Sequence, residues 1–478
     1  NAEGDQYYEV DVTDANGITY KMPQGNVYFP NIFHRDNYYD IYYQENYTKK
    51  RLNSVFGTLQ LGYKDMVYLD LTARNDWSSA LAFTESMSFF YPSVGATFLL
   101  DEMFHMNDDL FDMVKLRASY SVVGNDIPAY YSRPVATLSK LTITLPTVMP
   151  FTDWKPEKTF SIEAGFDLAM LHNRLRTEFT FYKANTKNQY FQVSAPVASG
   201  YSKRNINAGN VENLGIEASL SYRLDFNHDW SWTPGINFSY NKNEIKELCP
   251  GLEEYNLAEA SAFIMKLKKG GSYGDIYTYD FQYDDNGNIK LDNTGAPLLT
   301  SDADTYAGNF NSKFHLGWSN TINWKNLNIY ALVDGKIGGK VLSMTEAIMD
   351  GYGVSKATGD ARLNGGVPNK DGSMIDAEKY YSRVGGRAQN AGFNAMEYMY
   401  SATNFRLREL SVGYTFENLF GMNKNLTASV VGRNLFFLYK KSPCDPDISG
   451  STGNGWQGID VFSLPATRSW GLNLKLNF

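Results

Sequence analysis

The chain has 478 residues, which is enough for several soluble domains or one large β-barrel, and its net charge is −8. This acidic balance argues against binding along the phosphate backbone of a nucleic acid. A run of about 18 apolar residues is absent from the sequence, which excludes a helical membrane span. Aromatic residues reach 15%, a bias that favours β-strands.

Alternation of apolar and polar residues is the clearest pattern in the chain. Along residues 112–122, apolar Val114 and Leu116 alternate with basic side chains, which is the period of a strand with one apolar face. A charged inner face is expensive in a dry protein core but natural beside a water-filled lumen. The pattern predicts thirteen membrane-spanning strands, at 51–63, 65–75, 88–99, 112–122, 158–168, 173–186, 213–224, 231–241, 312–325, 326–337, 403–416, 424–435 and 466–478.

The connections between these strands alternate between short and long. Tight polar turns occupy 62–65 and 171–173, whereas 187–210, 243–311 and 338–402 are among the long connections. Bacterial barrels have short periplasmic turns and long extracellular loops, so we expect the long connections outside the cell. A strand-like segment near Tyr273 is assigned to one of these loops, because an extra crossing would break the alternation of sides.

Six short segments and an aromatic C-terminus follow one another in a characteristic order. They are Tyr68–Ser79 with Phe90–Gly95, Val114–Tyr120 with Gly124–Asn125, Asn210–Glu217, Phe405–Tyr414 and the terminal Phe478. In order and spacing, from about residue 51 to the end, these segments resemble the SusC-like branch of the TonB-dependent transporters, the nutrient importers of Bacteroidetes outer membranes.

The resemblance implies an all-β fold, an antiparallel barrel of about 22 strands with a plug inside it. The chain would supply the thirteen C-terminal strands as residues 51–478, and residues 1–50 would be an extracellular loop. The plug, the TonB box and the first strands are expected in an N-terminal portion of the same transporter that is not in this chain. An open sheet edge in lipid leaves backbone groups unpaired at several kcal/mol each, so the two portions are expected to pair.

The sequence contains no combination of residues typical of an enzyme. Only five histidines occur, and a zinc motif, a phosphate loop and paired cysteines close in sequence are all absent. Asp284–Asn288 resembles part of a calcium loop but lacks the flanking carboxylates, so we expect an Asx-rich turn there. We predict no catalytic residue, no cofactor and no metal site. Whether Cys249 and Cys444 pair is left open.

Aromatic residues of the long loops are the candidates for contact with a substrate or partner. Aromatic faces stack on sugars and apolar peptide side chains, while amide side chains bond to hydroxyls and amides. The alternative is that these rings pack the loops against one another or against a partner. The candidates are Trp77, Tyr130, Tyr131, Tyr201, Tyr398, Tyr400 and Trp456.

The resemblance implies active import of a nutrient, an oligosaccharide or an oligopeptide, across the outer membrane of a Gram-negative bacterium. A SusD-like surface lipoprotein would close the loops as a lid, and the TonB complex would supply energy. Two other classes compete with this reading. A surface β-rich adhesin or glycan-binding module would fold without detergent, and an outer-membrane barrel hydrolase would need a histidine-centred site at the rim.

Overall fold

The computed structural model describes residues 8–13, 19–24 and 49–478, except 108, 133–136, 140–141, 145, 150, 152, 196, 250, 387–393, 419–423, 449, 451–454 and 478. Residues 1–49 and 50–478 form two separate units. In the first unit, β1 (Tyr8–Thr13) and β2 (Thr19–Gln24) pair as an antiparallel hairpin. Most of the remaining residues of the expected loop 1–50 lie outside the described residues, so that assignment stays a prediction.

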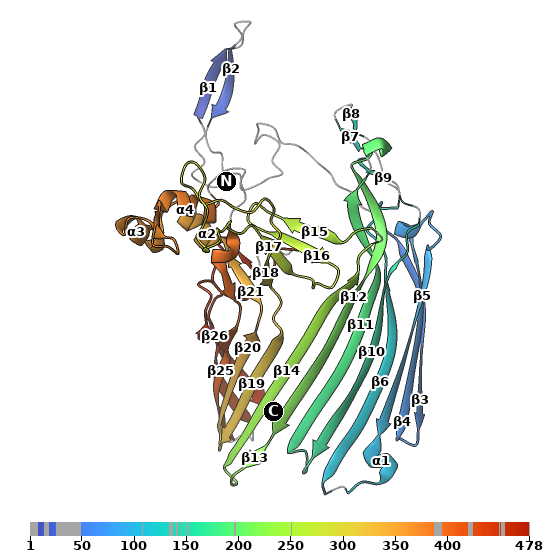
Figure 1. The fold of residues 1–478 in the computed structure, drawn as a ribbon. Helices are drawn as coiled ribbons and strands as arrows, with labels where there is room; N and C mark the ends of the chain where they lie inside the picture. Colours follow the sequence, from blue (N-terminus) through green and yellow to red (C-terminus); the bar gives the residue numbers. More distant parts are fainter. Residues whose placement is uncertain are drawn as a thin grey trace. The chain divides into compact units, whose positions relative to one another are not determined.

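All thirteen expected strands are confirmed, and they form one continuous antiparallel path in chain order (Figure 1). Two short strands are not part of this path: β9 (Val148–Met149) pairs with the strand that begins at Lys203, and β13 (Leu224–Asp225) pairs with the strand that begins at Trp230. The path consists of β3 (Leu52–Tyr63), β4 (Val67–Ser78), β5 (Ser88–Leu99), β6 (Phe111–Asn125), β10 (Glu157–Met170), β11 (Leu175–Ser194), β12 (Lys203–Tyr222), β14 (Trp230–Glu247), β19 (Phe314–Trp324), β20 (Leu327–Ile337), β25 (Asn404–Phe416), β26 (Asn425–Lys440) and β28 (Ser469–Asn477).

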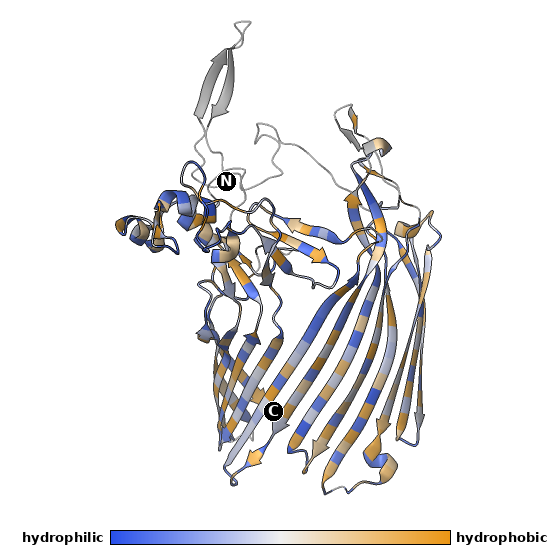
Figure 2. Ribbon diagram, in the orientation of Figure 1, coloured by the Kyte–Doolittle hydropathy of each residue, from blue (hydrophilic) through white to orange (hydrophobic). Residues whose placement is uncertain are grey.

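The strand register sorts the side chains into an apolar and a polar face. Leu116 lies opposite Phe166 on one face, and Lys115 lies opposite Asp167 on the other. Figure 2 shows the resulting alternation of orange and blue along the strands. The apolar side chains are not covered by protein, since Leu116 is 41% exposed. This is the arrangement of a barrel wall with hydrocarbon outside and water inside, and the face that carries Leu116 is called the outward face below.

The predicted outward residues are absent from the buried cores of the described chain. Val114, Leu116, Phe160 and Leu214 are all half-buried or exposed, and the three clusters of buried apolar side chains consist of other residues. None of the helices in the described part of the chain combines the length and apolar character of a membrane crossing.

Several strands are longer than expected at the end of the sheet that carries the long loops, called the loop end below. Strands β11 and β12 pair as far as Ser194 and Lys203, so most of the expected loop 187–210 is strand. On the outward face of this extension, Lys183 and Lys246 form ion pairs with Glu212 at 2.9 and 3.2 Å. Charges on the outward face mark the limit of the hydrocarbon, and beyond it both faces are polar, so the apolar alternation that predicts a strand is absent.

Two long loops and part of the last loop fold together into what we call the loop module, residues 254–310, 338–386, 394–402 and 455–460. Strands β15–β18 form a separate four-stranded sheet, which confirms that the segment near Tyr273 does not cross the membrane. The module elements are β15 (Glu254–Glu259), β16 (Ile264–Lys268), β17 (Asp275–Thr278), β18 (Thr305–Asn309), β21 (Lys340–Ser343), α2 (Met344–Gly351), α3 (Lys356–Leu363), β22 (Val367–Pro368), β23 (Met374–Ile375), α4 (Ala377–Val384), η3 (Ala395–Tyr398), β24 (Met399–Ser401) and β27 (Ile459–Asp460).

A single buried cluster holds the loop module together. Phe263 from the sheet, Leu342 and Val384 from the second loop and Ile459 from the last loop are each 0–1% exposed. Because none of these segments can bury its apolar side chains alone, their packing provides the main stabilisation of the module. The remaining short elements at the two ends of the sheet are η1 (Ser79–Leu81), α1 (Leu100–Phe104), β7 (Thr137–Ser139), β8 (Thr142–Thr144) and η2 (Val197–Ser199).

The Asx-rich turn expected at Asp284–Asn288 is confirmed. One carboxylate oxygen of Asp284 accepts hydrogen bonds from the backbone N–H groups of Asn286 and Asn288, at 2.9 and 2.8 Å. The carboxylate is therefore used inside the turn, which keeps its pKa below the ordinary value.

Lys266 is a buried charged residue of the module sheet, and we expect Lys266→Met to loosen this sheet. The ammonium bonds to Asp304 at 2.8 Å and to Glu254 at 3.2 Å, and it lies 5.2 Å from the centre of the Tyr277 ring. Losing charge-assisted bonds of this kind costs about 1.5–3 kcal/mol. Proteolysis of the folded protein within residues 254–309 should accelerate. Lys268→Met on the same strand is the control. The Lys268 side chain is exposed, and its ion pair with Glu254 is long, at 3.8 Å.

Acid should reduce the difference in stability between Lys266→Met and the unmodified protein. The hydrogen bond from Lys266 lowers the pKa of Asp304 below its ordinary value. The stabilisation from Asp304 is therefore complete above its unfolded pKa and is lost as the pH falls through the lowered folded value. A difference in protease sensitivity that is just as large below that pH would contradict this account.

Candidate ligand-binding cavity

A cavity of about 1000 Å³ opens between the inward face of the sheet and the loop module. The wall side comes from β11, β12, β14, β19 and β20, and the other side from β17, β18 and the last loop. Side chains that can form hydrogen bonds dominate the lining. The principal ones are Tyr182, Asn213, Asn241, Asn243, Tyr306, Asn309, Asn311, His315, Lys336, Asp447 and Gln457.

A ladder of amide side chains crosses the wall of the cavity. Tyr182 donates from its hydroxyl to Oδ1 of Asn241 at 3.2 Å, and Nδ2 of Asn241 donates to Oδ1 of Asn213 at 3.3 Å. Gly215 lies between Tyr182 and Asn241 in the register. A Cβ at Gly215 would come within 2.4 Å of the Tyr182 ring, so glycine is what allows the ring to lie across the strand and reach the amide.

Asn243 joins this ladder to the loop module. Its Nδ2 donates to Oδ1 of Asn213 at 2.9 Å, while its own Oδ1 accepts from the backbone N–H of Tyr273 at 2.8 Å. The turn at Tyr273 leads directly into β17. This amide is therefore one of the links between the wall and the loop module, together with backbone hydrogen bonds from Ile245 to Gly271 and from Gly270 to Ile245.

The module side of the cavity presents neutral hydroxyl and amide groups. Asp275 is buried and accepts from Nδ2 of Asn309 at 2.8 Å and from the Tyr306 hydroxyl at 3.4 Å. Partial burial and the Asp275 carboxylate raise the pKa of Tyr306 to about 12. The phenol therefore stays protonated at neutral pH, and more than half of this side chain is exposed.

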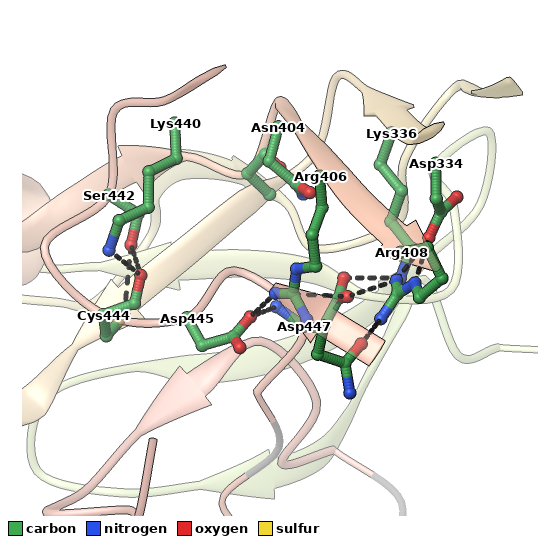
Figure 3. Close-up of polar contacts among 12 residues, drawn as sticks. Asp334, Lys336, Asn404, Arg406, Arg408, Lys440, Ser442, Cys444, Asp445 and Asp447 are labelled. Carbon is green, nitrogen blue, oxygen red and sulfur yellow. Dashed lines mark hydrogen bonds and ion pairs between the residues drawn. The ribbon is translucent and has the colours of Figure 1, made fainter. Parts of the chain in front are cut away.

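The third side of the cavity carries a group of ion pairs centred on Asp447 of the last loop (Figure 3). The Asp447 carboxylate lies 2.7 Å from Lys336 on β20, and 3.3 and 3.8 Å from Arg408 and Arg406 on β25. Burial favours the neutral acid, but Lys336 and Arg406 outweigh it and hold the pKa of Asp447 below its ordinary value. The carboxylate is therefore ionised at neutral pH.

Arg406 anchors the same loop from a more deeply buried position. It is 3% exposed, its Nη2 lies 2.6 Å from Asp445, and its guanidinium carbon lies 4.0 Å from the centre of the Phe437 ring. Its Nε has no hydrogen-bond partner among the described residues. Arg408 is the extra residue of a β-bulge, since Leu407 and Glu409 pair with both neighbouring strands and Arg408 with neither. Bulges of this kind redirect a side chain.

The seven aromatic residues proposed from the sequence are not gathered at this cavity. Trp77 lies in β4 on the outward face rather than in a loop. Tyr131 packs edge-on against Tyr190, with ring centres 5.7 Å apart. Tyr130 is exposed at a left-handed turn position, and Tyr201 is half-buried next to η2. Their role in binding stays a prediction.

The other three candidates lie inside or against the loop module. Tyr398 is 4% exposed and donates to Asp350 at 2.9 Å. Tyr400 donates to Glu346 on the same helix, and Trp456 packs against Phe263 with ring centres 5.6 Å apart. These contacts match the alternative role considered for the loop aromatic residues, in which the rings pack the loops against one another.

The sequence alone did not identify the residues that line the cavity, although several of them occupy the polar positions of predicted strands. Asn213 and Asn241 are inward positions of predicted strands, and a run of asparagines at the loop end of such positions is the available signal. Cys249 and Cys444 are not bonded to each other, which answers the open question about their pairing. Within the described residues, no group of three or more His, Cys, Asp or Glu side chains could hold a metal ion.

Comparisons with known proteins agree with this architecture. Residues 1–335 match the family model described as TonB dependent receptor-like, beta-barrel. TonB-dependent receptor P3 of Formosa agariphila is 25% identical over 470 residues, 89% of this chain and 45% of the relative. TonB-dependent receptor SusC of Bacteroides thetaiotaomicron is 23% identical over 90% of this chain and 44% of that protein. The chain thus spans about half the length of the curated relatives it matches.

Among solved structures, the RagAB peptide importer in its open-open state superposes with a TM-score of 0.71. The identity is 21%, and the superposition covers 90% of this chain and 47% of that chain. At this identity the likeness concerns the fold. Together, these findings confirm the resemblance to SusC-like proteins, and the chain belongs to the TonB-dependent receptor β-barrel family.

Proposed function

We propose that this chain is part of an outer-membrane importer that takes up an oligosaccharide or an oligopeptide with energy delivered through TonB. The observation that carries the proposal is the sheet itself, with an exposed apolar face, a charged inward face and a polar cavity at its loop end. Such a wall separates hydrocarbon from water. A cavity at one mouth of a lumen is where an importer would first hold its cargo. No covalent chemistry is part of the proposal.

The lining of the cavity supports an oligomeric cargo. Ligand pockets for small molecules measure roughly 300–1,000 Å³, and this one is about 1000 Å³. Amide groups and tyrosine hydroxyls line it from several strands, and they suit the hydroxyls of a sugar or the amides of a peptide equally. The substrate is therefore proposed at the level of these two classes.

The edges of the sheet support a larger assembly. Among the residues that the structure describes, strands β3 and β28 each pair on one side only, and every residue of both is exposed. Unpaired backbone groups in hydrocarbon cost several kcal/mol each. We propose that both edges pair with strands of an N-terminal portion of the same transporter, which would also carry the plug. A SusD-like surface lipoprotein is proposed as the lid over the loop module.

Uptake by whole cells tests the proposal. Cells carrying the complete transporter should accumulate a labelled oligosaccharide or oligopeptide, and a protonophore or loss of TonB should abolish accumulation while surface binding remains. Asn213→Ala should weaken binding about tenfold, because Asn213 lines the cavity and its oxygen holds two amide side chains in place, and a lost hydrogen bond costs about 0.5–1.5 kcal/mol.

Asn323→Ala is the matched control for this experiment. Asn323 is on the inward face, at the far end of β19, where it bonds to Ser231 at 3.2 Å. We expect this variant to bind and import normally. Accumulation that persists without TonB, or equal effects of the two alanine variants, would contradict an importer that holds its cargo at this cavity.

A further inference from the structure

The cavity is polar in two different ways on its two sides. Strands β11, β12 and β14 present the amide ladder and the carboxylate of Glu217, whereas β19 and β20 present basic groups. His315 and Lys336 lie directly opposite each other in the register, and Lys313 precedes them on the inward face. Arg406 and Arg408 on the next strand lie behind this side and reach the cavity only through their ion pairs with Asp447.

The carboxylates that neutralise this basic side come mainly from the last loop. Asp334 is the wall carboxylate that pairs with Arg408, but Asp445 and Asp447 belong to the loop. The Lys336–Asp447 pair remains accessible from the cavity, since the two side chains are 32% and 21% exposed. Arg406 beneath them keeps an Nε without a partner among the described residues. If Asp447 moved away, Lys336, Arg406 and Arg408 would keep only Asp334 and Asp445 as carboxylate partners in the described part of the chain, and the wall would hold an excess of positive charge.

We propose that Asp447 occupies a carboxylate-binding site formed by Lys336, Arg406 and Arg408, and that the imported oligomer bears carboxylates that replace it there. This inference rests on the proposed function and specifies its substrate class, an acidic oligosaccharide or an acidic peptide. Lysine and arginine make charge-assisted bonds to carboxylates of either source. Asp447 keeps the site neutral while it is empty, which avoids leaving buried cations uncompensated.

The geometry favours exchange at Asp447 over exchange at Asp445. Asp445 pairs with a 4% exposed side chain and would stay in place as the anchor of the loop. Asp447 pairs with three cations, two of which are about one-third exposed. An incoming carboxylate can therefore approach Lys336 from the cavity before Asp447 has left. The competing reading is that Asp447 only fastens the loop to the wall.

Calorimetric binding to the complete purified transporter in detergent separates these readings. The probes are tetragalacturonate and tetra-aspartate as the acidic oligomers, with maltotetraose and tetra-alanine as neutral counterparts. At least one acidic probe should bind, and added salt should weaken it. Asp447→Asn removes the competitor and should raise the affinity for that probe about tenfold, and Lys336→Met should lower it about tenfold, as expected for one charge-assisted bond. Neutral probes should not respond to either change.

Lys115→Met is the matched control. Lys115 is also a cation of the inward face, but it lies outside the cavity and forms an ion pair with Asp167, with 2.5 Å between the charged atoms. It should leave all four affinities unchanged. A loss of affinity in Asp447→Asn, or no change in either cavity variant, would overturn the inference. Import of a neutral oligomer alone would also overturn it while leaving the proposed function intact, and failure to import any oligomer would count against the proposed function itself.

Discussion

Arg406→Met should destabilise the loop end of the barrel by about 3–5 kcal/mol, the cost of removing one partner from a buried ion pair. Asp445 is only 12% exposed in this pair and would be left without its cation. The Phe437 ring would also lose the guanidinium that stacks on it. Urea-driven unfolding of the complete protein in lipid vesicles should show the loss, and proteolysis within residues 441–448 should become rapid.

Arg433→Met provides the comparison for this variant. Arg433 also forms an arginine–carboxylate pair, at 2.9 Å from Glu409, but its side chain is 63% exposed. Exposed pairs contribute about 0–1 kcal/mol because water competes for both partners. We therefore expect this variant to unfold almost like the unmodified protein. Equal destabilisation by the two changes would mean that burial of Arg406 is not what makes its pair strong.

Leu116→Arg should destabilise the folded barrel by about 2–4 kcal/mol, the cost of placing a cation on the lipid face near the bilayer midplane. Leu116 lies opposite Phe98 and Phe166 on the outward face and is 41% exposed. An arginine there would have hydrocarbon as its solvent. The equilibrium between the urea-unfolded and the vesicle-inserted protein measures the effect, and thinner bilayers should reduce it because the guanidinium reaches the headgroups more easily.

Lys115→Arg tests the neighbouring residue on the other face. Lys115 is directed to the lumen beside Asp167, and arginine keeps the charge and the partner, so the change should be nearly silent. Tolerance of Leu116→Arg to the same degree would show that hydrocarbon does not cover this face, and the membrane assignment would fail with it.

Local pattern was sufficient for the barrel strands because each crossing repeats one simple environment. Hydrocarbon on one side and water on the other impose a period of two on every strand, and short turns force successive strands to pair. The residues predicted to face the lumen therefore included Asn213 and Asn241, which line the cavity. Where β11 and β12 leave the bilayer, both faces meet water, the period disappears, and the residues up to Ser194 were assigned to a loop.

The loop module lay beyond what any local pattern could show. Phe263, Leu342 and Ile459 are buried together, although almost two hundred residues separate the first from the last in the sequence. For the same reason the sequence could not show that Tyr398 and Trp456 pack within this module. Whether a loop aromatic faces a substrate or a core depends on partners that are distant in sequence.

The amino-acid order by itself determined the membrane-spanning sheet, its two faces and its chain-order pairing, because these depend on neighbours one or two residues away and on the solvent. Only the tertiary structure decided the cavity and the Asp447 site. Lys336, Arg406 and Asp447 belong to two strands and a distant loop. Their charges interact only because folding brings Asp447 within 2.7 Å of Lys336 and 3.8 Å of Arg406.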